Sequence, residues 1–84
     1  MIIEVYSKEG CGYCTAAVSL LQNKGIKFTE EKLGIHFTRE MLLEKFPYAK
    51  AFPVVVVDGM HIGGYIELNE ELNKKSSGQT LLNE

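Results

Sequence analysis

The strongest indication of the fold comes from the segment Ile2-Ile3-Glu4-Val5-Tyr6-Ser7-Lys8-Glu9-Gly10-Cys11-Gly12-Tyr13-Cys14. Its first five residues are β-prone, and the turn residues from Ser7 to Gly10 end that run. After Cys14, apolar residues recur at helical spacing as far as Leu21, and Gly25 supplies a stop. We therefore predict a strand, a loop and a helix from about Gly12 to Lys24, with Cys11 at the N-terminal edge of the helix.

Two further elements are expected in the middle of the chain. Ile26 to Lys32 alternates between apolar and charged residues, which predicts a second strand. Thr38 is placed to act as the N-cap of a second helix, and Pro47 ends that helix. The chain up to this point is predicted to run strand, helix, strand, helix.

The last third of the chain predicts a hairpin and a third helix. The strand Val54 to Val57 is followed by Asp58-Gly59, and this dipeptide between apolar runs is a strong hairpin signal. Leu68 and Leu72 mark a short amphipathic helix that we expect to stop near Ser76 to Gly78. We predict a single domain over residues 1–84, with a core of about residues 2–76 and a loosely held tail at 77–84.

The order of these elements is β-α-β-α-β-β-α, which predicts an α/β fold. A parallel beginning and an antiparallel hairpin end, joined by short connections, fit one four-stranded mixed sheet with helices on both faces. This is the thioredoxin-like arrangement.

The composition favours an ordinary globular domain. The 84 residues are 45% hydrophobic and 24% charged, and the formal net charge is -2 with scattered basic residues, which argues against nucleic acid as a partner. The N-terminus lacks the basic flank and long apolar run of a secretory signal, and no apolar run is long enough to cross a membrane. We expect a cytoplasmic protein without a membrane partner.

Both cysteines lie in the segment Cys11-Gly12-Tyr13-Cys14. A disulfide there would close a very short loop and stabilise the fold little, and structural disulfides are rare in the cytosol, so the pair indicates redox or metal chemistry. Positions three apart at a helix start share a face, which allows a reversible disulfide. Cys11, at the positive end of the helix, is the expected nucleophile, and Cys14, one turn inside, is the expected resolving thiol.

The surroundings of the cysteine pair leave some alternatives open. Lys8 either favours the Cys11 thiolate or is a solvated loop lysine, and Tyr13 is either an exposed lid beside the sulfur or packs on its neighbours. A structural zinc site is disfavoured because it needs two more ligands, and His36 and His61 are far apart in the sequence. We expect no metal.

Three sets of residues, taken in order, resemble the glutaredoxin family, particularly its small bacterial and phage members. They are Val5-Tyr6-Ser7-Lys8 before Cys11-Gly12-Tyr13-Cys14, then Phe52-Pro53, then Ile62-Gly63-Gly64-Tyr65. The resemblance covers about residues 2–75. It implies a monomeric dithiol–disulfide oxidoreductase that uses glutathione as co-substrate and reduces protein disulfides and glutathione mixed disulfides. It also implies ribonucleotide reductase as a client.

The resemblance further implies where glutathione binds. Pro53 is expected to be cis and to lie opposite Cys11, with Phe52 offering its backbone to the cysteine of glutathione. The resemblance implies that the backbone N–H groups of Gly64, Tyr65 and Ile66 receive the glutamyl end of glutathione. It implies that Lys8 and Arg39 are cations for the glycyl carboxylate. Tyr13 is expected to contribute an aromatic ring to the same site.

Two departures from the family concern this same site. Ala51-Phe52-Pro53 replaces the usual Thr-Val-Pro, so a hydroxyl is missing and a bulky ring borders the groove. Family members usually have an acidic residue directly after the position of Tyr65, whereas here Ile66 comes first and Glu67 second. The resemblance therefore leaves the fine substrate preference open and predicts the loss of one side-chain contact.

Two other functions remain alternatives at this point. A thioredoxin would take its electrons from a flavoprotein reductase, but the chain is short, has no Trp, and has Gly12-Tyr13 rather than Gly-Pro between its cysteines. A carrier of a [2Fe-2S] cluster would hold it with Cys11 of two subunits and two glutathione molecules. The absence of proline at position 12 keeps this second alternative open.

Overall fold

The first strand and helix form where the sequence predicts them. In the computed structural model, which describes residues 1–80 and the side chains of residues 1–73, β1 spans Ile3–Ser7 and α1 spans Gly12–Asn23. The elements that follow are β2 (Thr29–Lys32), α2 (Arg39–Lys45), β3 (Val54–Val57), β4 (Met60–Gly63) and α3 (Tyr65–Thr80).

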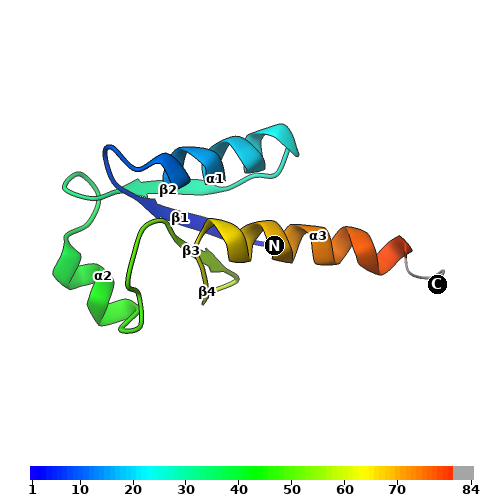
Figure 1. Cartoon of the computed structure of the whole chain (residues 1–84). Helices are drawn as coiled ribbons and strands as arrows, with labels where there is room; N and C mark the ends of the chain where they lie inside the picture. The colour runs from blue at the N-terminus through cyan, green and yellow to red at the C-terminus, as the bar shows by residue number, and fades with distance from the viewer. Residues whose placement is uncertain (81–84) are drawn as a thin grey trace.

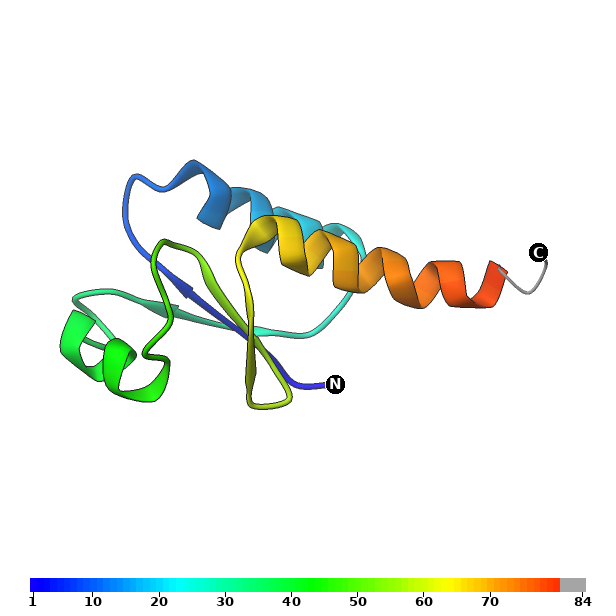
Figure 2. The ribbon, with the colours of Figure 1, turned by 60° about the horizontal axis from the view of Figure 1, so that its bottom comes forward.

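The strands form one four-stranded sheet in the order β2-β1-β3-β4. β1 pairs with β2 in parallel and with β3 antiparallel, and β3 pairs antiparallel with β4. Helices α1 and α3 lie side by side over one face of the sheet, and α2 lies on the other (Figures 1 and 2). The predicted thioredoxin-like fold, a mixed sheet with helices on both faces, is confirmed.

Alternation along the central strands divides the core into two clusters. Side chains of successive strand residues point to opposite faces. Val5 and Val55 therefore pack under α1 and α3 with Leu21 and Leu68, all of them fully buried. The strand residues that point to the other face are Tyr6, Val54 and Val56, and they form a second cluster under α2. Leu42 of α2 and Phe37 from the loop before it complete this cluster.

The hairpin between β3 and β4 turns at the predicted dipeptide. Asp58 and Gly59 both have positive φ values, 51° and 83°, which is the requirement of a type I′ turn. The Asp58 carboxylate also accepts a hydrogen bond from the backbone N–H of Ile2, with an N–O distance of 2.8 Å. This contact ties the start of the chain to the hairpin.

The second helix begins with the predicted cap, and two other boundaries differ from expectation. Thr38 Oγ1 accepts a hydrogen bond from the backbone N–H of Met41 at 3.2 Å. β2 begins only at Thr29, because parallel pairing with β1 starts there. The prediction that the last helix stops near Ser76 to Gly78 was wrong: α3 continues to Thr80, since one glycine costs a helix only about 1 kcal/mol and does not end it.

The tail predicted at the C-terminal end lies partly within α3. Of the tail predicted at 77–84, residues 77–80 belong to α3, and residues 81–84 lie outside the described part of the chain.

Among the described residues, no helix combines the length and the apolar character needed to cross a bilayer.

Candidate active site

The cysteine pair lies where the loop after β1 meets the start of α1. Cys11 is the N-cap of α1, and its sulfur accepts a hydrogen bond from the backbone N–H of Cys14 at 3.2 Å. The sulfur thus takes the place that a serine or aspartate oxygen commonly has at a helix start. The free N–H groups and the positive end of the helix stabilise negative charge on this atom. Cys11 is half-buried, and both cysteines are free thiols.

Cys14 lies one turn further into α1 and is only 3% exposed, as its predicted place nearer the core requires. Burial, followed by the hydrogen bond between this thiol and the Cys11 sulfur, raises the pKa of the Cys14 thiol to about 12. A backbone hydrogen bond from Lys8 lowers the pKa of Cys14, but its effect is smaller than that of burial. Cys14 therefore stays protonated at neutral pH, which separates the two thiols chemically.

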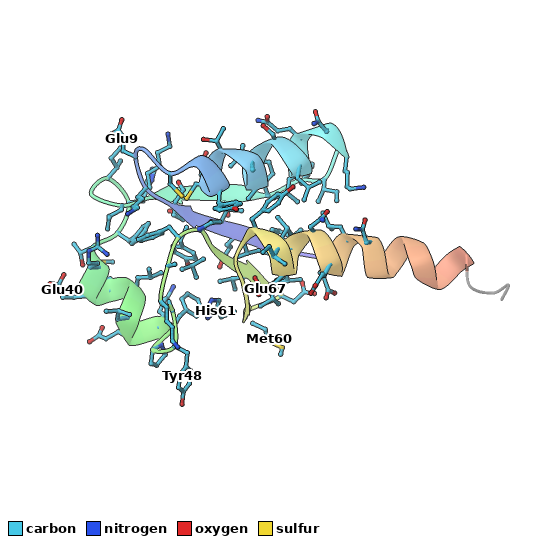
Figure 3. All side chains as sticks on the ribbon, in the orientation of Figure 1. Glu9, Glu40, Tyr48, Met60, His61 and Glu67 are labelled. Carbon is cyan, nitrogen blue, oxygen red and sulfur yellow. The ribbon has the colours of Figure 1, made fainter. Side chains whose placement is uncertain are left out.

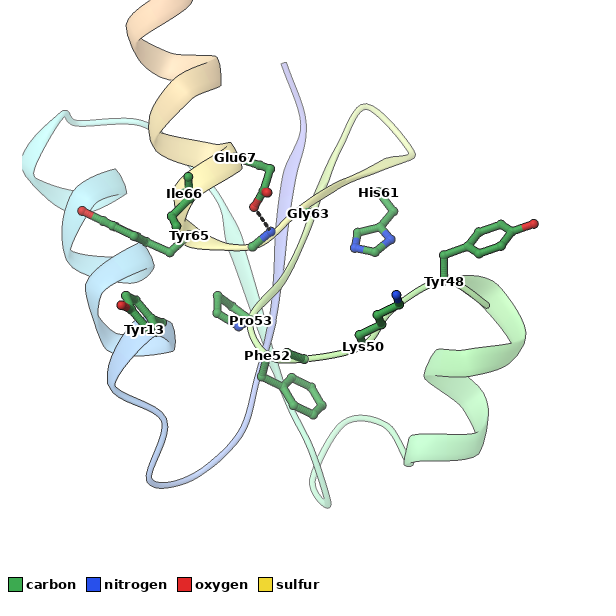
Figure 4. A pocket seen from close by; sticks show the side chains of 12 residues that line it. Tyr13, Tyr48, Lys50, Phe52, Pro53, His61, Gly63, Tyr65, Ile66 and Glu67 are labelled. Atoms are coloured by element: carbon green, nitrogen blue, oxygen red, sulfur yellow. Dashed lines mark hydrogen bonds between the residues drawn. The ribbon is translucent and has the colours of Figure 1, made fainter.

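An open groove of about 410 Å³ lies beside the cysteine loop. The tyrosine rings of Tyr13 and Tyr65 stack at one end of it, with their centroids 5.9 Å apart. Figure 4 shows Pro53 between this pair and the residues of the far end, where Lys50 and His61 lie near Tyr48. The groove brings together six of the residues predicted for the site, namely Tyr13, Phe52, Pro53, Gly64, Tyr65 and Ile66.

Phe52 connects this groove with two cations. The peptide bond between Phe52 and Pro53 is cis, as the resemblance implies. The ring of Phe52 turns away from Lys50 and His61 (Figure 4) and lies 5.7 Å from Lys8 Nζ and 5.8 Å from the guanidinium carbon of Arg39. Both distances are within the range of cation–π contacts. The unusual phenylalanine therefore holds the two predicted cations on its ring.

Two glycines allow the chain to turn from β4 into α3. Gly63 has a φ of 132°, a region that favours glycine, and a β-carbon there would lie 2.5 Å from Glu67 Cγ. A β-carbon at Gly64 would lie 3.2 Å from the carbonyl oxygen of Pro53. The pair of glycines thus places the start of α3 directly against the cis-proline.

Comparison with known proteins shows the family. The sequence model of the family "Glutaredoxin" matches residues 3–62. The chain belongs to the glutaredoxin family. Among curated proteins, glutaredoxin 3 of Escherichia coli strain K12 is 33% identical over 66 residues, which cover 79% of this chain and 80% of the relative. The family is one of thiol–disulfide oxidoreductases, and this chain is one of them.

Two solved glutaredoxin structures show how far the likeness of the fold extends. Reduced Escherichia coli glutaredoxin superposes with a TM-score of 0.73 at 27% identity, covering 92% of this chain and 99% of that one. A buckwheat glutaredoxin in complex with glutathione gives a TM-score of 0.72 at 25% identity, with coverage of 90% and 73%. The likeness of the fold therefore extends over about nine-tenths of this chain in both comparisons.

Glu67 has a role in this glutaredoxin that the sequence analysis missed. Its Oε1 accepts a hydrogen bond from the backbone N–H of Gly64 at 2.8 Å, drawn as a dashed line in Figure 4. Gly64 is the residue before α3 and Glu67 is the third residue of the helix, which is the reciprocal half of a capping box. The spacing of these two residues was the signal that would have revealed it. One of the three N–H groups predicted to receive a ligand is thus bonded within the chain.

The Glu67 cap predicts a dependence of stability on pH. The N–H of Gly64 holds the pKa of Glu67 below its ordinary value of 4.5, and the N–H of Glu67 adds to this effect. Because the folded-state pKa is lowered, the charged carboxylate stabilises the protein above about pH 4.5, and this contribution is lost as the pH falls through the folded-state value.

We expect Glu67→Gln to destabilise the protein by at most about 0.5 kcal/mol near neutral pH, because the side chain is exposed and screened. Glutamine keeps an oxygen for Gly64 but removes the charge. Urea unfolding of both proteins from about pH 7 to about pH 3 measures the difference, which should shrink toward the acid end. Glu70→Gln, one turn further along α3, is the control. A difference that grows toward low pH would contradict the cap.

Other lining residues also escaped the sequence analysis. Tyr48 follows α2 and is 85% exposed, and Figure 3 shows it projecting away from the rest of the molecule. His61 on β4 packs against the ring of Phe46, with the centroids 5.8 Å apart. No motif joins these residues in the sequence, because they come from separate elements that meet only after the hairpin has folded back over the sheet.

Proposed function

We propose that this protein reduces glutathione mixed disulfides and protein disulfides, with glutathione as the electron donor. The observation that carries the proposal is the pairing of a half-buried Cys11 at a helix N-terminus with a buried, protonated Cys14, beside an open groove lined by the cis-proline. This arrangement separates a nucleophile from a resolving thiol. It also leaves an open surface on which a small thiol peptide can bind.

The proposed reaction begins with attack of the Cys11 thiolate on a disulfide sulfur. With a glutathione mixed disulfide, Cys11 bonds to the sulfur of glutathione and the client leaves as a thiolate. A second glutathione thiolate then attacks the bound glutathione, which releases glutathione disulfide and restores the Cys11 thiolate. With a protein disulfide, Cys14 attacks Cys11 instead and forms the Cys11–Cys14 disulfide, which two glutathione molecules reduce.

The redox balance supports glutathione as the donor. Glutaredoxin couples have potentials of about -200 to -230 mV, close to extraction-based values of about -220 to -260 mV for the cytosolic glutathione pool. Electrons can therefore flow from the pool to this disulfide. For the same reason we propose the cytosol as the compartment, and disulfide-bonded cytosolic proteins as clients. Ribonucleotide reductase is the client that the family resemblance suggests.

The proposed binding mode places glutathione along the cis-proline. The backbone of Phe52 pairs with the cysteine of the ligand, and its glycyl carboxylate lies near Lys8 and Arg39, the two cations on the Phe52 ring. Since Glu67 already bonds Gly64, the glutamyl carboxylate is assigned to the N–H groups of Tyr65 and Ile66, which have no acceptor within the first turn of a helix. The relative from buckwheat, whose structure is a glutathione complex, supports glutathione as the ligand.

Two parallel assays test the proposed function. Turnover of a glutathione mixed disulfide is measured with glutathione, glutathione reductase and NADPH, and beside it with thioredoxin reductase in place of the glutathione system. We expect activity only with glutathione. Activity only with thioredoxin reductase would reject glutathione as the donor. Activity with neither would reject the proposed reaction altogether.

A further inference from the structure

A carboxylate that the reaction above does not use lies close to the cysteine pair. Glu30 is the second residue of β2, and its register partner on β1 is Val5, so both side chains point to the sheet face covered by α1. Glu30 is half-buried there. Ser7, only 2% exposed, donates a hydrogen bond from its Oγ to Glu30 Oε2 at 2.9 Å. The serine thus holds the carboxylate in one place.

Glu30 and both cysteines line the same polar pocket. This pocket, of about 570 Å³, shares no lining residue with the groove that holds the two tyrosines. Its walls include Ser7, Cys11, Cys14 and Glu30. The negative charge of Glu30 is also among the influences that raise the pKa of Cys14, of which burial is the largest. Glu30 and the Cys14 thiol therefore face the same pocket.

Cys14 needs a new proton acceptor during the resolving step. In the reduced protein its thiol is hydrogen-bonded to the Cys11 sulfur. Once Cys11 is part of a mixed disulfide, that sulfur carries no charge and is a poor acceptor. Cys14 must nevertheless lose its proton before it can attack, because only the thiolate is a nucleophile.

We propose that Glu30 accepts the proton of Cys14 as Cys14 attacks Cys11. The S–H bond of Cys14 breaks, and its proton moves to the Glu30 carboxylate. The Cys14 sulfur bonds to the Cys11 sulfur, and the bond from Cys11 to the client breaks. The client leaves as a thiolate with the electron pair of that bond, and the proton on Glu30 then passes to it or to water. This inference rests on the proposed dithiol reaction.

The other charged groups facing this pocket do not fit the role. Lys8 from the loop and Lys32 from β2 are cations at neutral pH and accept no proton. Glu9 is the remaining carboxylate, but it is exposed, and Figure 3 shows it pointing into solvent. Among these lining groups of the described residues, Glu30 is the carboxylate held by a partly buried hydrogen bond.

The test separates the two chemical steps in a single turnover. Reduced protein is mixed with 5,5′-dithiobis(2-nitrobenzoate), which releases one coloured thiolate when Cys11 attacks and a second when Cys14 resolves the mixed disulfide. In Glu30→Gln, glutamine keeps an acceptor for Ser7 but is no base. We expect the first release to be unchanged and the second to slow about tenfold or more, with a steeper rise of its rate with pH.

Two further variants make the test specific. Glu31→Gln is the matched control, because Glu31 is the adjacent strand residue and lines the pocket beside Tyr6 on the other face of the sheet. It should leave both releases unchanged. Glu30→Asp keeps a carboxylate and should recover part of the second rate. An unchanged second release in Glu30→Gln, or equal slowing of both releases, would overturn the role of Glu30. A wild-type protein without a second release would reject the dithiol reaction itself.

Discussion

Replacing Cys11 with serine is expected to abolish glutathione-dependent disulfide reduction, whereas Cys14→Ser keeps activity on glutathione mixed disulfides. A serine at position 11 cannot form the mixed disulfide on which every later step depends, so we expect a loss of at least about a hundredfold in kcat/KM. Cys14 acts only after the first bond has formed. A glutathione mixed disulfide needs no internal resolving thiol, since a second glutathione can attack it.

Both variants are measured with two substrates in the coupled assay with glutathione, glutathione reductase and NADPH. One substrate is a glutathione mixed disulfide and the other is a protein disulfide. Cys14→Ser should retain the first activity and lose most of the second. Equal losses in the two variants on the mixed disulfide would show that the assignment of nucleophile and resolving thiol is wrong.

Truncation of Leu68 to alanine is expected to destabilise the fold by about 2–5 kcal/mol, the range for a fully buried leucine. Leu68 lies in the cluster under α1 and α3 and is completely buried among Val5, Leu21 and Val55. A small domain has a total stability of only about 5–15 kcal/mol, so this loss is a large share of it. The same cluster fixes α3 against the sheet and thereby the position of Tyr65 on Tyr13.

Denaturant unfolding of Leu68→Ala and of a matched surface variant measures this effect. Leu43→Ala on α2 is the control, because Leu43 is 45% exposed and should cost less than about 1 kcal/mol. Equal destabilisation by the two variants would show that the cluster under α1 and α3 does not carry the stability that its burial implies.

Most of the fold was predictable because local patterns specify local structure. The Asp58-Gly59 turn, the Thr38 cap and the helix that begins after Cys11 each depend on residues within a few positions of one another. The end of α3 was not predictable in this way. Serine and glycine lower helix propensity without forbidding a helix, so composition alone places such an end poorly.

The predicted site residues are brought together to different degrees. Tyr13, Pro53 and Tyr65 line one groove, as the resemblance implies. Lys8 and Arg39 both contact the ring of Phe52, and the spacing of these residues in the sequence does not predict this contact. Their roles in binding glutathione remain predictions.

The order of strands and helices and the position of two cysteines at a helix start could be predicted from the sequence alone. These features depend on hydrophobic periodicity and on a few turn and cap residues. Three contacts became visible only in the folded structure: Glu67 bonds Gly64, Phe52 holds two cations, and Glu30, which is bonded to Ser7, lines one pocket with Cys14. The reason is physical: such contacts depend on side-chain packing, and those at Phe52 and Glu30 join segments that meet only when the sheet has formed.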